Sequence, residues 1–146
     1  MKCPIISLSL LMNNQLCRAS LDGNINLVKN LLKKGATDYN SAMIYAAQGG
    51  YIEIVNLMLN LGATNYNSAM IYAARGGYLE IVQLMLEKGA TNYNSSMEYA
   101  AERGHIEIVQ LMLDKGANDY NSAIEWTKNE DIKRLLQIFK DGKNKL

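Results

Sequence analysis

The stretch GATNYNSAMIYAARGGYLEIVQLMLEKGATNYN, residues 62–94, begins and ends with the same six letters, which recur after 27 residues. Residues 41–67 and 68–94 are identical at 22 of 27 positions, and residues 95–121 follow the same pattern. A fixed period between about 20 and 50 residues is typical of stacked supersecondary repeats. The sequence therefore predicts a single solenoid domain over residues 1–146.

The copies at the two ends are less regular than the central ones. Residues 14–40 are a divergent copy. Residues 122–146 are predicted to be a capping repeat, one residue shorter at its middle turn, in which Ile138 takes the place of Met112. Residues 1–13 form an apolar lead-in, which either covers the open end of the core or is a weak signal peptide.

Each copy has the pattern of two short helices. In residues 68–94, the segment 69–75 contains good helix formers, and Gly76–Gly77 then end the helix because glycine accepts positive φ. The segment 79–86 is apolar around most of a helix, so it must be buried on several sides. No alternation with a period of two appears, and we therefore expect an all-α fold. Short polar side chains can accept a bond from a free N–H at each first-helix start, so we predict four caps: Asn40, Asn67, Asn94 and Asn121.

Residues 73–90, AARGGYLEIVQLMLEKGA, resemble the core of the ankyrin repeat, in which two alanines, a Gly-His turn, an Ile-Val pair and Gly-Ala recur in this order. Residues 100–109, AAERGHIEIV, match better because they contain the Gly-His. The resemblance covers about residues 14–142 and implies a solenoid of stacked helix-turn-helix repeats. Repeats of this family have about 33 residues, including a projecting β-turn. The 27-residue copies are therefore predicted to lack the long β-hairpin fingers. Short repeats rich in Asn and Tyr also resemble those of giant DNA viruses.

The residue types give little support for catalysis or for metal binding. The only histidine, His105, is predicted to form a hydrogen bond within the turn between two helices, where the family has a structural histidine. Cys3 and Cys17 are too few for a disulfide framework, which favours a reducing compartment such as the cytoplasm. A row of glutamates is expected to be a solvated stripe paired with lysines: Glu53, Glu80 and Glu107. We expect no enzyme activity, no cofactor and no metal site.

The charge balance also bears on the partner class. A net charge of +1 offers no electrostatic case for binding nucleic acid or an anionic membrane. No apolar run approaches the roughly 20 residues that a membrane-spanning helix needs. A protein partner is the remaining expectation.

The period of 27 turns each repeat position into a row of side chains. One row lies in the first helices: Tyr45, Tyr72 and Tyr99, with Arg18 preceding it and Trp126 continuing it. Its role is open between packing and binding. A second row lies in the loops, Tyr39, Tyr66, Tyr93 and Tyr120, and is expected to be structural. The resemblance implies that the first helices line the concave surface. We therefore predict the partner-binding residues where this surface is aromatic or varies between copies: Ile44, Tyr45, Gln48, Ile71, Tyr72, Arg75, Glu98, Tyr99, Glu102, Glu125 and Trp126.

Two hypotheses follow for function. The first is a monomeric recognition module that binds a partner protein through this surface, and a viral origin would make the partner a host protein in the host cytoplasm. The alternative is a structural protein that self-associates through the exposed end of its stack, using residues 5–12.

Overall fold

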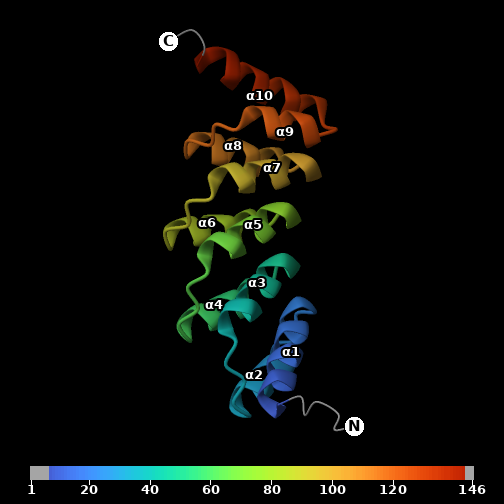
Figure 1. The fold of residues 1–146 in the computed structure, drawn as a ribbon, viewed down its shortest axis with the longest axis vertical. Helices are drawn as coiled ribbons and strands as arrows, with labels where there is room; N and C mark the ends of the chain where they lie inside the picture. Colours follow the sequence, from blue (N-terminus) through green and yellow to red (C-terminus); the bar gives the residue numbers. More distant parts are fainter. Residues whose placement is uncertain (1–6, 144–146) are drawn as a thin grey trace, which may run out of the picture. The chain divides into compact units, whose positions relative to one another are not determined.

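The computed structural model describes residues 7–143, which form ten α-helices and no strand (Figure 1). The helices are α1 (Leu8–Leu21), α2 (Ile25–Lys33), α3 (Tyr39–Gly49), α4 (Ile52–Asn60), α5 (Tyr66–Gly76), α6 (Leu79–Glu87), α7 (Tyr93–Arg103), α8 (Ile106–Asp114), α9 (Tyr120–Trp126) and α10 (Glu130–Lys143). They fall into two compact units, which we call unit 1 (Met1–Asn65) and unit 2 (Tyr66–Leu146). The predicted all-α fold, without hairpin fingers among the described residues, is confirmed.

Unit 1 consists of two helix pairs, α1–α2 and α3–α4. The first helices α1 and α3 pack on each other, and each also packs on the second helix of its own pair. The inner side of α3 is made by four fully buried residues, Ala42, Met43, Ala46 and Ala47. The alanines let the neighbouring helices approach closely, because a larger side chain would hold them apart.

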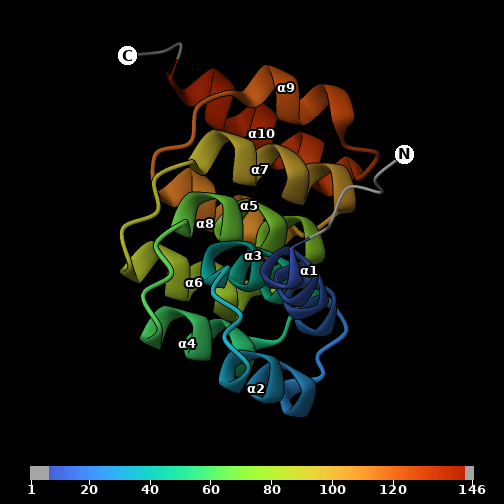
Figure 2. The same cartoon turned by 60° about the horizontal axis from the view of Figure 1, so that its bottom comes forward.

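Unit 2 contains three helix pairs stacked in the same way. The first helices α5, α7 and α9 follow one another, with α7 between the other two in both views (Figures 1 and 2). The second helices α6, α8 and α10 form the other layer and pack on one another in turn. Met70 and Met97 fill the inner sides of α5 and α7, while Val82 and Val109 do so on α6 and α8. Stacking thus buries the predominantly apolar second helices, as expected for a repeat array.

The predicted asparagine caps are wrong: Asn40, Asn67 and Asn94 bind the next loop instead, and the cap of α9 is Asp119 rather than Asn121. The amide oxygen of Asn67 accepts hydrogen bonds from the backbone N–H groups of Thr91 (2.7 Å) and Asn92 (3.0 Å). Asn13, Asn40 and Asn94 make the same pair of bonds to the loop 24 and 25 residues ahead. The reason is that α3, α5, α7 and α9 begin at a tyrosine, two residues earlier than predicted, so the cap of α3 is Asp38, which accepts from the N–H of Ser41.

Aromatic rings at the middle turns contact the glycines of the preceding repeat. The Tyr51 ring lies where a methyl group on Gly23 would be, and the His105 ring would meet a methyl on Gly77 at 2.5 Å. His105 Nε2 is 3.2 Å from the carbonyl oxygen of Arg75, one repeat earlier. The expectation of a hydrogen bond within its own turn is therefore wrong: the histidine joins two consecutive pairs.

The last helix pair has a shorter first helix and a longer turn than the repeat pattern predicted. Thr127 is buried and extended, so α9 ends at Trp126, and the Asn129 side chain accepts from two N–H groups to start α10. As a result α10 begins 24 residues after α8. Ile132 and Leu136 are fully buried, whereas Ile138 is 68% exposed and does not replace Met112. The shift arises because α9 has 7 residues where α7 has 11, while the turn after α9 is only one residue longer.

The N-terminal lead-in also differs from expectation. Residues 8–13 belong to α1, whose start is capped by the Ser7 hydroxyl accepting from the N–H of Leu10 (3.2 Å). Leu8 is 71% exposed and Leu11 is 47% exposed, so these side chains do not cover the core. The lead-in residues Met1–Ile6, with Cys3 among them, lie outside the described residues.

Candidate partner-binding face

All eleven predicted partner-binding residues lie on the first helices and are exposed or half-buried. We call the outward side of these helices the first-helix face. On α3, the buried side is taken by Met43, Ala46 and Ala47, so helical spacing leaves Tyr45 and Gln48 on the outward side. Three of the predicted residues belong to unit 1: Ile44, Tyr45 and Gln48. Eight belong to unit 2: Ile71, Tyr72, Arg75, Glu98, Tyr99, Glu102, Glu125 and Trp126.

The aromatic row on this face is accessible. Tyr45 is 40% exposed, Tyr72 and Tyr99 are each 36% exposed, and Trp126 is 57% exposed. By contrast, in the loop row Tyr39, Tyr66 and Tyr93 are half-buried and Tyr120 is 8% exposed. The burial of the loop tyrosines favours a packing role for them. The first-helix tyrosines and Trp126 keep enough free surface to contact a partner.

In unit 2 the face contains a groove of about 300 Å³ between α5 and α7. It is lined by Ser68, Ile71, Tyr72, Arg75, Ser95 and Tyr99. The Arg75 guanidinium lies over the Tyr99 ring, 5.8 Å from its centroid, which is the geometry of a cation–π contact. Four of the predicted residues therefore come together around one hollow.

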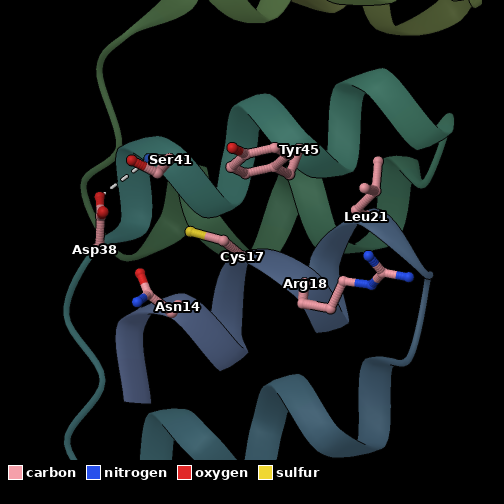
Figure 3. Close-up of a pocket in the computed structure, with 7 residues that line it drawn as sticks. All are labelled: Asn14, Cys17, Arg18, Leu21, Asp38, Ser41 and Tyr45. Atoms are coloured by element: carbon pink, nitrogen blue, oxygen red, sulfur yellow. Dashed lines mark hydrogen bonds between the residues drawn. The ribbon is translucent and has the colours of Figure 1, made fainter. Parts of the chain in front are cut away.

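Unit 1 has an equivalent groove of about 360 Å³ between α1 and α3. Figure 3 shows its lining residues, which are Asn14, Cys17, Arg18, Leu21, Asp38, Ser41 and Tyr45. Asp38 is held by its capping bond to Ser41 (3.1 Å), and Arg18 Nε donates to the Asp22 carboxylate at 2.9 Å. The groove is thus polar on both sides, with one thiol inside it.

The Cys17 thiol is held in its protonated form. Burial is the main cause and the nearby Asp38 carboxylate adds to it, and together they raise the pKa of Cys17 to about 11. A thiol with such a pKa is a poor nucleophile near neutral pH, because the thiolate is the reactive species. In this groove Cys17 acts as a small half-buried lining side chain.

Sequence reasoning missed most of the unit 1 groove because the first copy is divergent. The 27-residue offset placed Arg18 before Tyr45 in the first-helix row, and it also puts Cys17 at the repeat position of Ile44 and Ile71. Applying the offset to every predicted residue would have extended the face to α1.

Outside this face, one of the predicted glutamate–lysine ion pairs is present. Lys29 and Glu53 form an exposed ion pair at 3.6 Å on the second helices, as predicted for one member of the glutamate stripe. Within residues 7–143, no group of three metal-ligating side chains is placed to hold a metal ion. In the same part of the chain, none of the helices has the length and apolar character to cross a membrane.

Comparison with known proteins identifies the repeat. Residues 16–96 and 64–124 both match the family model for ankyrin repeats (three copies), so the two matches together span residues 16–124 of 146. A search of curated proteins found no match to the sequence. With helix pairs stacked in both units and the family match covering most of its length, the chain belongs to the ankyrin repeat family.

Proposed function

We propose that this chain is a recognition module that binds a partner protein through the first-helix face. Ankyrin repeats are in general protein–protein interaction modules and typically have no enzymatic activity. The observation that carries the proposal is the row of exposed aromatic residues beside the grooves, since Tyr and Trp are enriched at binding hot spots. The short repeats resemble those of giant DNA viruses. If the chain is viral, its partner would be a protein of the host cytoplasm.

Affinity capture with the immobilised chain tests this proposal. A partner retained by the unaltered chain is expected to be lost from the Tyr72→Ala/Tyr99→Ala variant, and to be weakened by Arg75→Glu/Glu102→Arg. Removing an aromatic hot-spot side chain costs on the order of 2 kcal/mol or more in binding.

The matched control reverses the same charges on the second-helix side, as Glu80→Arg/Lys88→Glu. Both control residues are exposed on or beside α6. Equal retention by all three variants would reject the first-helix face as the binding surface.

A second candidate function is self-association through the start of α1. Leu8, Leu10, Leu11 and Leu27 are exposed by 71%, 52%, 47% and 41%, which leaves several large apolar side chains uncovered in unit 1. Light scattering over a concentration series tests it. A mass that rises with concentration, and returns to the monomer in Leu8→Ser/Leu11→Ser, would support this function, while a constant monomer mass would remove it.

A further inference from the structure

The first-helix face of unit 2 changes its charge from one helix to the next. On α5 the charged residue is Arg75, whereas α7 carries Glu98 and Glu102 with Arg103 at its last position, and α9 carries Glu125. Arg75 is directed at the Tyr99 ring. The part of the face on α7 and α9 is therefore acidic.

Two of these carboxylates have no ion-pair partner among residues 7–143. Glu102 lies 3.6 Å from the neighbouring Arg103, but Glu98 and Glu125 form no ion pair with any described residue. Glu125 is exposed and Glu98 is half-buried. Partial burial makes an unpaired carboxylate more receptive to an external cation, since water screens the charge less there.

Exposed aromatic rings accompany these carboxylates at neighbouring positions of the same helices. Tyr99 follows Glu98 on α7 and Trp126 follows Glu125 on α9, but Arg75 already lies over the Tyr99 ring, so Trp126 is the ring open to an external cation. Trp126 is 57% exposed and has the ring type that attracts cations most strongly. A planar guanidinium can stack on such a ring and also donate two hydrogen bonds to a carboxylate.

We propose that α7 and α9 bind a basic, arginine-containing segment of the partner protein. This inference rests on the proposed function and specifies the chemistry of the segment that the first-helix face accepts. Arginine side chains of the segment pair with Glu98 and Glu125, and the arginine at α9 also stacks on Trp126. Where the segment reaches α5, Arg75 excludes a second basic residue.

A short fluorescein-labelled peptide rich in arginine, glycine and serine is the probe, with anisotropy of the label as the readout. We expect saturable binding to the full chain, weakened at least about tenfold in Glu98→Gln/Glu125→Gln, because two charge-assisted contacts are lost. The matched control is Glu80→Gln/Glu107→Gln, which removes the same charge from the exposed starts of α6 and α8 and should bind normally. The emission of Trp126, the only tryptophan of the chain, should change on binding.

Several outcomes would overturn the inference. One is equal weakening of peptide binding by the two double variants, which would indicate non-specific attraction. The others are an unchanged Trp126 emission and the absence of saturable binding. A partner protein whose capture depends on Tyr72 and Tyr99 but tolerates Glu98→Gln/Glu125→Gln would also overturn it. That last result would leave the proposed function standing, whereas insensitivity of capture to the tyrosines would remove the proposed function itself.

Discussion

Asn67 joins one repeat to the next with a single side-chain atom. Its amide oxygen satisfies two backbone N–H groups in the loop that replaces the long β-turn of the usual ankyrin repeat. A loop this short has few internal bonds, so a side chain from the preceding helix supplies them. The same atom in Asn13, Asn40 and Asn94 does so in the other loops.

The variant Asn67→Ala should lower the free energy of unfolding by about 1–2 kcal/mol, because two hydrogen bonds are lost. Asn121 provides the control, since it occupies the same repeat position as Asn67. Its side chain is exposed and accepts no hydrogen bond from a loop N–H among the described residues. Asn121→Ala should change the stability by less than about 0.5 kcal/mol. Urea unfolding followed by circular dichroism measures both, and equal losses would contradict the role assigned to Asn67.

Cys17 gives the protein a pH dependence at alkaline pH. Its pKa is raised from the ordinary 9.0 to about 11, first by burial and then by Asp38. The folded state therefore holds the thiol proton more tightly than the unfolded state does. The Cys17 proton therefore makes its full contribution to the free energy of unfolding below pH 9. This contribution is lost as the pH rises from about 9 through 11.

Alkylation by iodoacetamide in a Cys3→Ser background measures this pKa. The rate should reach half its maximum near pH 11, and Asp38→Asn should move the midpoint down but not back to 9.0, since burial remains. The difference in unfolding free energy between this background and Cys3→Ser/Cys17→Ser should change over the same pH range. A midpoint at 9.0 in the folded protein would contradict the assignment.

At the scale of helices and turns, Gly77 is required for two reasons, its backbone conformation and its contact with the His105 ring. Its φ of +82° disfavours other residues, and a methyl group there would be 2.5 Å from the His105 ring. Gly116 has a φ of +102° with no atom within 4 Å, so it meets only the first requirement. Comparing alanine variants of the two glycines therefore distinguishes the cost of backbone strain from the cost of disturbing the contact between consecutive repeats.

Gly116→Ala should cost about 1 kcal/mol, as expected for a non-glycine residue at positive φ. Gly77→Ala should cost about 1–3 kcal/mol more because it also displaces the ring. Adding His105→Ala to Gly77→Ala should recover part of that excess. Thermal unfolding measures all three variants, and equal costs at the two glycines would show that the ring contact does not contribute.

The shifted register of α10 makes a separate prediction. Ile132→Ala or Leu136→Ala should lower the unfolding free energy by about 2–4 kcal/mol, because both side chains are fully buried. Ile138→Ala should have almost no effect, since that side chain is 68% exposed. The opposite ranking in urea unfolding would restore the alignment in which Ile138 replaces Met112.

Much of the helix pattern was predictable, because the period repeats the same physical signals. Of the two glycines predicted to end the first helix, Gly77 has a positive φ of 82°, whereas Gly76 is still part of α5. The role of Asn67 was not predictable, because its partners are 24 and 25 residues away and a local rule favours a cap. The register of α10 was missed because the buried Thr127 ends α9 early without a glycine to mark the turn.

The candidate face was predictable in part. The 27-residue offset identified the first-helix aromatic row, whose four members are exposed in the structure. It could not show that Arg75 lies over Tyr99, or that Cys17 and Asp38 share a groove, because these contacts depend on the spacing of neighbouring helices.

At the scale of the whole molecule, the two units differ in the number of helix pairs. Unit 2 has three pairs, and its core includes fully buried residues from α7, α8 and α10: Met97, Met112 and Leu136. Unit 1 has two pairs. A repeat cannot bury its apolar face alone, and about three repeats are needed for a stable array.

Residues 66–146, produced as a separate fragment, should therefore be helical and unfold in a cooperative thermal transition, whereas residues 1–65 should show at most a shallow one. Circular dichroism of both fragments and of the full chain measures this. The variant Leu136→Ala in the fragment 66–146 serves as a check that its transition reports the native core. A sharp transition in residues 1–65, or none in residues 66–146, would contradict the argument from the number of pairs, because stability would then be set by something other than stacked neighbours.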